Sequence, residues 1–70
     1  MTEVRGDLPG RTIKEYKKGF WRLTYFKSHG YHCLTLRESR KPAKSWYSKD
    51  KKEIDEFVEE KINEGFELVK

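Results

Sequence analysis

The clearest pattern along the chain is a pair of strand-like stretches. Residues 20–27 and 31–37 are rich in aromatic and β-branched side chains, and Ser28, His29 and Gly30 between them supply a turn. Glycine in such a turn can take the positive φ that tight hairpins require. The pattern therefore predicts an antiparallel hairpin.

If Phe26 lies opposite Tyr31, the alternation of side chains assigns each residue of the hairpin to one of two faces. One face is mostly apolar and contains Trp21, Leu23, Tyr25, His32, Leu34 and Leu36. The other face mixes rings, hydroxyls and cations and contains Phe20, Arg22, Thr24, Phe26, Tyr31, Cys33, Thr35 and Arg37. A turn centred on His29 and Gly30 shifts the pairing by two residues and leaves this division unchanged. The apolar face is the better candidate for packing on a core.

A helical stripe follows the strands. Its apolar residues recur at helical spacing and are Ile54, Phe57, Val58 and Ile62. Ser48 or Asp50 can cap the helix N-terminus, Asp50 and Glu53 have capping-box spacing, and Gly65 suits the C-terminal cap. The opposite side is acidic and contains Asp55, Glu56, Glu59 and Glu60. We expect this acidic side to be solvated, and a docking face for a basic protein is the alternative.

The other segments complete the predicted fold. Residues 44–48 are a third candidate strand, whereas residues 11–17 and 66–69 leave strand character open. The predicted fold class is α+β, with a small three-stranded antiparallel sheet, or a four- or five-stranded one, and one C-terminal helix packed on one face. Residues 1–10, with two glycines and one proline, predict a flexible N-terminal arm, and residues 11–70 a single domain.

Charge is sorted along the sequence, which points to a polyanionic partner. Residues 11–52 contain thirteen Lys or Arg against three acids, a net charge of +10, whereas residues 53–70 carry a net charge of −5. Aromatic residues are interleaved with the cations, and this combination is typical of surfaces that bind nucleic acid.

Size and composition exclude several classes. Seventy residues make one small domain with little room for a closed pocket, so we expect no enzyme activity and no cofactor. The single cysteine, Cys33, excludes an internal disulfide and fits a reducing compartment. His29, His32 and Cys33 lack the fourth ligand of a structural zinc site, so we expect no metal. Without a signal peptide or a long apolar run, the sequence predicts a cytoplasmic protein with no membrane contact.

The predicted binding site combines the mixed face of the hairpin with cations around it. Cations neutralise phosphates, and rings stack on bases. The candidate nucleic-acid-binding residues are Arg22, Phe26, Lys27, Tyr31, Arg37, Arg40, Lys41 and Lys44. Alternatively, the cations keep an exposed sheet soluble and the rings pack across strands.

Gly19, Phe20 and Trp21 open the first of the three predicted strands, and Gly30 lies in the first turn. The predicted order of these three strands followed by a helix resembles that of two DNA-binding families. These are the sheet-reading arm-binding domains of phage-type integrases and the plant AP2-type domains. The resemblance, one of element order and a few spaced residues, implies binding to DNA through the sheet.

The functional hypothesis is thus a small DNA-binding protein, such as a regulator from a phage or mobile element, with duplex DNA favoured over single strands or RNA. The alternative is a protein-binding regulator or inhibitor whose basic aromatic face docks on an acidic protein surface. Aromatic and Arg residues also dominate protein interfaces, so composition alone does not separate the two hypotheses.

Overall fold

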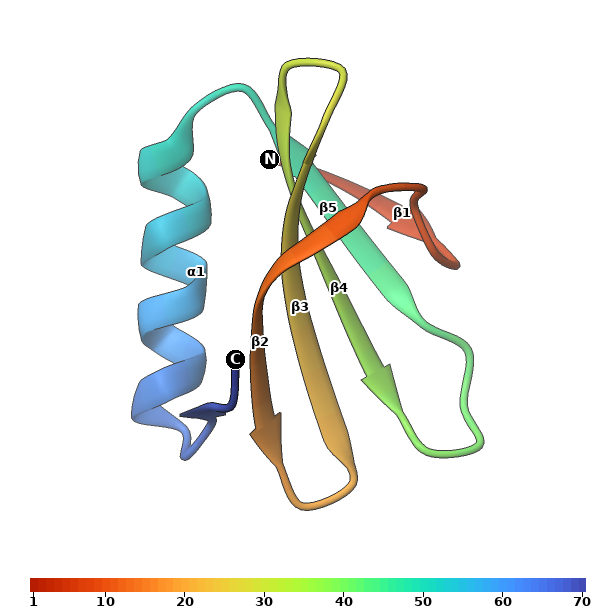
Figure 1. Ribbon diagram of the computed structural model, residues 1–70, viewed down its shortest axis with the longest axis vertical. Helices are drawn as coiled ribbons and strands as arrows, with labels where there is room; N and C mark the ends of the chain where they lie inside the picture. Colours follow the sequence, from red (N-terminus) through yellow and green to blue (C-terminus); the bar gives the residue numbers. More distant parts are fainter.

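The computed structural model describes residues 1–70 and contains six strands and one helix (Figure 1). The elements are β1 (Thr2–Arg5), β2 (Arg11–Lys18), β3 (Trp21–Ser28), β4 (Tyr31–Glu38), β5 (Lys44–Ser48), α1 (Lys51–Asn63) and β6 (Glu67–Leu68). The strands form one antiparallel sheet in the order β1-β5-β4-β3-β2-β6. The predicted α+β class, with an antiparallel sheet and one helix, is confirmed. The sheet has six strands rather than the predicted three to five.

The central hairpin confirms the predicted division into faces but not the first choice of register. Strands β3 and β4 pair Leu23 with Leu36 and Phe26 with Cys33, two residues away from the predicted pairing of Phe26 with Tyr31. His29 and Gly30 form a two-residue turn, and both have positive φ, 50° and 82°. Two such residues match the right-handed twist of the strands, which favours this register.

The main core lies between α1 and the apolar face of the sheet. Leu23, Leu34 and Ile54 are fully buried there, and the Trp46 ring lies against Phe57 with the ring centres 4.8 Å apart. The Trp46 side chain therefore lies on the inward face of β5, a face that the sequence pattern did not assign.

The last turn of α1 differs from the predicted apolar stripe. Ile62 is 46% exposed, and Lys61 lies closer to the core, with its ammonium nitrogen 5.3 Å from the centre of the Phe57 ring. The inward stripe therefore continues at Lys61, seven residues after Ile54, and not at Ile62, and the ammonium group of Lys61 lies over the Phe57 ring.

Both ends of α1 are capped by side-chain or backbone hydrogen bonds. The Asp50 carboxylate accepts a hydrogen bond from the Lys52 amide at 3.0 Å, which confirms Asp50 as the N-cap. The predicted partner Glu53 instead accepts a hydrogen bond from the Ser48 hydroxyl at 2.8 Å. At the other end, the amides of Gly65 and Phe66 donate to the carbonyls of Ile62 and Lys61 in a Schellman arrangement, which the positive φ of Gly65 permits.

Segments whose patterns were weak form β2 and both edges of the sheet. Residues 11–17 lie within β2, and Glu67–Leu68 pairs with β2 as β6. Thr2–Arg5, part of the predicted flexible arm, forms edge strand β1. By pairing with β5, β1 gives hydrogen-bond partners to backbone groups of β5 that would otherwise lie at an open edge. This stabilisation comes from the backbone and does not depend on an apolar sequence pattern.

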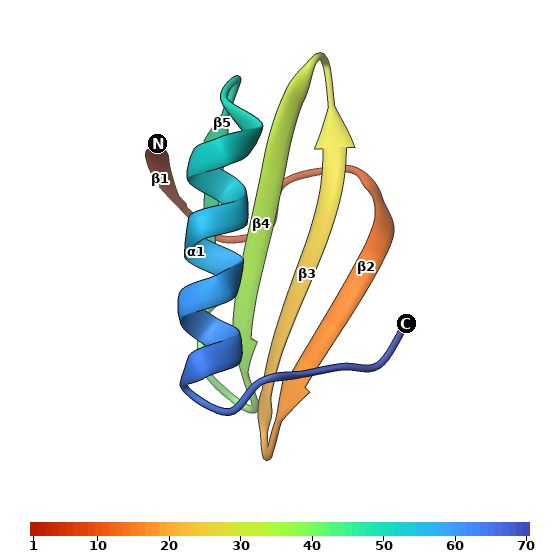
Figure 2. The same ribbon diagram turned by 90° about the vertical axis from the view of Figure 1, so that its left-hand side faces the viewer.

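Residues 6–10, the crossing segment, run from β1 to β2 over the sheet face opposite α1, which we call the open face (Figures 1 and 2). The Gly6 amide donates to the Ala43 carbonyl at 2.8 Å, and the buried Ser45 hydroxyl donates to the Gly6 carbonyl at 2.6 Å. Gly10 lies so close to Phe26 that a Cβ on residue 10 would collide with the ring. The open face is therefore partly covered by the chain itself.

The only helix, α1, is too short and too polar to cross a bilayer.

Candidate nucleic-acid interface

The eight predicted site residues do not share one surface. Four of them belong to the open face by strand alternation, and they are Arg22, Phe26, Tyr31 and Arg37. Lys27 and Lys44 have the opposite parity and belong to the helix side of the sheet, as partners of His32 and Leu36. Arg40 and Lys41 lie in the loop between β4 and β5, where Lys41 forms an ion pair with Glu38 at 3.1 Å.

Neither ring of the predicted site is a free stacking platform. Phe26 is only 3% exposed because Gly10 of the crossing segment lies against it. Tyr31 is half-buried and packs edge-on against Tyr47, with ring centres 5.2 Å apart. The Lys49 ammonium lies 5.4 Å from the centre of the Tyr31 ring, so this ring already has a cation partner. The expectation that Phe26 stacks on bases is therefore wrong for the structure as folded.

Three cations stand side by side across the uncovered end of the open face. Lys17 on β2 pairs with Arg22 on β3, which pairs with Arg37 on β4. We call these three residues the cationic row. Neighbouring strands are ~4.8 Å apart, so the row spans ~10 Å. Like charges directly opposite each other destabilise a sheet, so this arrangement has a structural cost.

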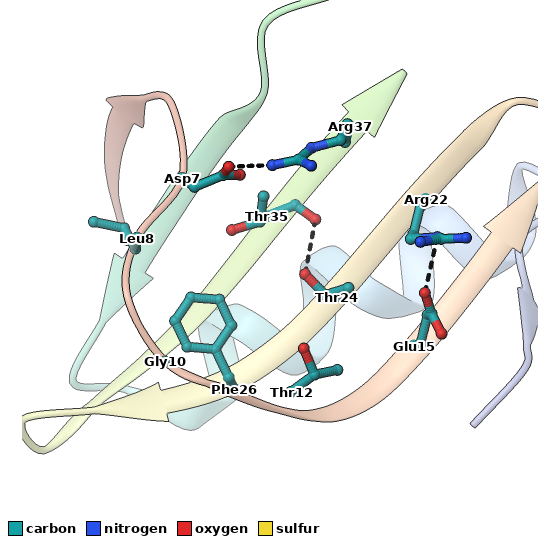
Figure 3. Close-up of a pocket in the computed structure, with 10 residues that line it drawn as sticks. All are labelled: Asp7, Leu8, Gly10, Thr12, Glu15, Arg22, Thr24, Phe26, Thr35 and Arg37. Atoms are coloured by element: carbon teal, nitrogen blue, oxygen red, sulfur yellow. Dashed lines mark hydrogen bonds and ion pairs between the residues drawn. The ribbon is translucent and has the colours of Figure 1, made fainter. Parts of the chain in front are cut away.

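Two carboxylates partly offset that cost. The Arg22 guanidinium forms an ion pair with Glu15 at 2.8 Å, and Arg37 pairs with Asp7 of the crossing segment (Figure 3). The arginine side chains remain 56% and 54% exposed, so both stay accessible from solvent. No such pair is formed by Lys17, which is exposed. An anion can thus reach the cationic row from solvent, while the two carboxylates hold the arginine side chains in place.

Phe20 is the exposed ring beside the cationic row. It lies in the turn between β2 and β3 and is 83% exposed, and its carbonyl accepts a hydrogen bond from the Ser39 amide at 3.2 Å. Phe20 and the three residues of the row all line a shallow hollow of about 270 Å³. Arg40 lines the neighbouring hollow with Phe20, which brings this one predicted loop cation to the same end of the sheet.

The eight predicted site residues include neither Lys17 nor Phe20, although the alternation placed Phe20 on the mixed face. The signal for Lys17 is its cross-strand pairing with Arg22, and that register follows a bulge between Thr12 and Lys14. The bulge also interrupts the alternation of the two apolar residues of β2, so that Tyr16 is buried whereas Ile13, at the bulge, is exposed.

A cavity of about 250 Å³ adjoins the cationic row beneath the crossing segment (Figure 3). Arg22 and Arg37 line one end of it, whereas Gly10 and Phe26 line the other. The other lining residues of the cavity are Asp7, Leu8, Thr12, Glu15, Thr24 and Thr35. Most of these side chains carry hydrogen-bonding groups, so the cavity is suited to a polar ligand.

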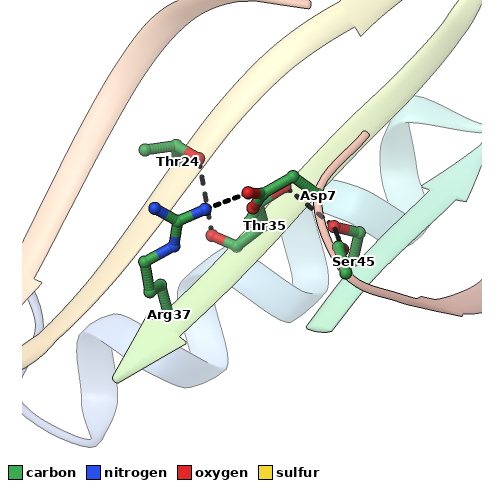
Figure 4. Close-up of polar contacts among 6 residues, drawn as sticks. Asp7, Thr24, Thr35, Arg37 and Ser45 are labelled. Carbon is green, nitrogen blue, oxygen red and sulfur yellow. Dashed lines mark hydrogen bonds and ion pairs between the residues drawn. The ribbon is translucent and has the colours of Figure 1, made fainter. Parts of the chain in front are cut away.

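Buried hydroxyls attach the crossing segment to the floor of this cavity (Figure 4). The Thr35 and Ser45 hydroxyls are 2.9 Å apart, and Ser45 continues the chain of hydrogen bonds to the Gly6 carbonyl. The Thr24 hydroxyl donates to the Thr35 carbonyl at 3.5 Å. Because Thr35 and Ser45 are buried and satisfied, they fix the position of Asp7 relative to Arg37.

Groups with shifted pKa values lie outside the cationic row. Burial raises the pKa of the Cys33 thiol, which keeps it protonated at neutral pH. Burial, with a smaller contribution from Asp55, raises the pKa of Tyr25, whose hydroxyl lies 2.8 Å from His32 Nδ1. The hydrogen bond from Ser48 lowers the pKa of Glu53. His32 and Cys33 are neighbours on β4 and point to opposite faces, and no three potential metal ligands come together.

The acidic side of α1 lies away from the cationic row. Its exposed carboxylates belong to Asp55, Glu56, Glu59 and Glu60. The helix packs on β4 and β5 from the side opposite the open face, so the sheet separates these acids from the row (Figure 2).

No protein-family model, curated protein or solved structure matches this chain. The six strands and the crossing segment also depart from the order of three strands and a helix on which the likeness to integrase and AP2-type domains depends. The case for a function therefore rests on the residues of this chain.

Proposed function

We propose that the protein binds nucleic acid, in particular DNA, through the cationic row and Phe20. The observation that carries this proposal is the alignment of Lys17, Arg22 and Arg37 on three adjacent strands. Such an arrangement of like charges destabilises the isolated sheet, and the attraction of an anionic partner would offset the repulsion among the three cations.

The dimensions of the row suit a chain of phosphates better than a single small anion. A row of ~10 Å is long enough to face two or three phosphates, since one DNA strand carries a charge per ~3.4 Å of helix axis. Arginine also binds phosphate oxygens through two parallel hydrogen bonds, as it binds carboxylates.

The position of Phe20 supports the same function. The Phe20 ring is 83% exposed, so its face is available to a partner. A base stacks on such a ring, and the neighbouring cations hold the backbone beside it. Arg40 at the same end of the sheet adds one more cation.

A binding titration at several salt concentrations tests this proposal. We expect labelled DNA to bind in ~50 mM salt and the affinity to fall steeply as salt rises, because several phosphates are neutralised at once. Failure of micromolar protein to bind duplex DNA, single-stranded DNA or RNA at that salt would refute the proposal. The predicted alternative, an acidic protein surface as the partner, would then be the next hypothesis to test.

A further inference from the structure

Given the proposed function, on which the following step rests, the shape of the open face determines which form of nucleic acid can bind there. The sequence favours duplex DNA lying on an open sheet. In the structure, the crossing segment stands over that face, and it leads from the edge beside β5 to β2 (Figures 1 and 2). A rigid duplex is therefore kept from the floor of the sheet, whereas a flexible strand can pass beside the segment.

We propose that the ligand is single-stranded nucleic acid and that one unpaired nucleotide enters the cavity beneath the crossing segment. Arg22 and Arg37 belong both to the cationic row and to the lining of this cavity. A strand whose phosphates lie along the row is thus placed at the entrance, with one nucleotide directed toward Thr24.

The size of the cavity limits what it holds. Its volume of about 250 Å³ lies below the ~300–1,000 Å³ typical of sites for drug-sized ligands, so the cavity suits a group no larger than about one nucleotide. A paired base would have to leave its duplex to enter, and this unpairing weakens duplex binding relative to a strand that is already single.

The chemistry of the lining suits the edge of a base. The Thr12 hydroxyl can donate and accept hydrogen bonds, whereas the Thr24 hydroxyl, whose proton goes to the Thr35 carbonyl, can accept one. The carboxylates of Asp7 and Glu15 can accept hydrogen bonds from amino groups. When phosphates engage the two arginines, these carboxylates become available to the bound nucleotide. Phe26 closes the far end of the cavity, where Gly10 leaves only 3% of the residue exposed.

Fluorescence anisotropy with four labelled probes tests the proposal: a mixed-sequence 12-nucleotide DNA strand, the same sequence as RNA, a matched duplex, and the DNA strand with abasic positions. We expect a single strand, of DNA or RNA, to bind roughly tenfold or more tighter than the duplex, since one seated base is worth about that factor. The abasic strand should bind more weakly than the intact one.

Thr24→Ile fills the cavity floor with a residue that favours strands, and Thr2→Ile is the matched control on edge strand β1. Thr24→Ile should weaken single-strand binding by roughly tenfold and reduce the penalty for abasic sites, while Thr2→Ile changes neither. The salt dependence should stay as in the wild type, because no cation is removed.

The outcomes separate the two proposals. A duplex that binds as tightly as the strand, or an intact strand that binds Thr24→Ile as it binds wild type, overturns the single-strand proposal and leaves nucleic-acid binding standing. Absence of binding to every probe overturns both. If Thr24→Ile proves unfolded, the duplex and abasic comparisons on the wild-type protein decide the matter.

Discussion

The two carboxylates paired with the cationic row provide a sharp prediction, because their removal should affect binding and stability in opposite directions. In the free protein, Asp7 and Glu15 occupy the arginines that we assign to phosphate. The combined variant Asp7→Asn, Glu15→Gln keeps the size of both side chains and removes both charges. The arginines then bind phosphate without first losing a carboxylate partner.

The magnitude follows from the exposure of these pairs. Both arginine side chains are more than half exposed, and exposed ion pairs contribute ~0.2–1 kcal/mol each. Loss of both pairs should therefore lower the free energy of unfolding by ~0.4–2 kcal/mol. The same energy no longer opposes binding, so affinity should rise by roughly 2- to 30-fold.

Fluorescence anisotropy with a labelled abasic DNA strand measures the affinity for phosphates without any contact of Asp7 or Glu15 with a base, and urea denaturation measures the stability. The control is Glu56→Gln with Glu59→Gln on the exposed side of α1, which changes the net charge equally without contacting the row. If the Asp7 and Glu15 variant binds no tighter than this control, its carboxylates do not compete with phosphate, and the row is not the phosphate site.

Three further substitutions test the ring and the packing. Phe20→Ala should weaken binding of single-stranded DNA while leaving the salt dependence and the melting temperature almost unchanged, since an exposed ring carries no charge; unchanged affinity would contradict its stacking role. Gly10→Ala should lower stability by ~1–3 kcal/mol in urea denaturation, because its Cβ collides with Phe26, and a stable variant would show that the crossing segment is not closely packed. Phe57→Ala should cost ~2–3 kcal/mol, less than the ~3–5 of a fully buried ring, and an unchanged melting temperature would be inconsistent with the contact between Phe57 and Trp46.

Sequence patterns predicted those features that depend on local alternation. The division of Leu23 and Arg22 onto opposite faces is correct because side chains alternate along a strand whatever its exact register. The N-cap at Asp50 and the end of the helix near Gly65 are likewise local signals, and both are confirmed. Arg22 and Arg37 were therefore placed on the right face before any pairing was known, whereas Lys27, also predicted for the site, lies on the helix side.

The features that the sequence did not predict depend on backbone contacts between segments far apart along the chain. The crossing segment is held through the hydrogen bonds of Gly6 with Ala43 and Ser45, and neither glycine nor a carbonyl acceptor leaves a hydrophobic pattern. For the same reason, burial of Phe26 beneath Gly10 was not predictable. Lys17 joins the row only through a register set after a bulge, which local alternation does not reveal.

The most direct test of the central claim is the salt dependence of binding by the Arg22→Ala, Arg37→Ala variant. Its matched control, Arg5→Ala with Arg11→Ala, removes two exposed arginines outside the row. If the row contacts phosphates, the slope of log affinity against log salt should fall by roughly 1.4–1.8 for the row variant, at ~0.7–0.9 per phosphate, and less for the control. A row variant that binds with wild-type affinity and an unchanged slope would contradict the account.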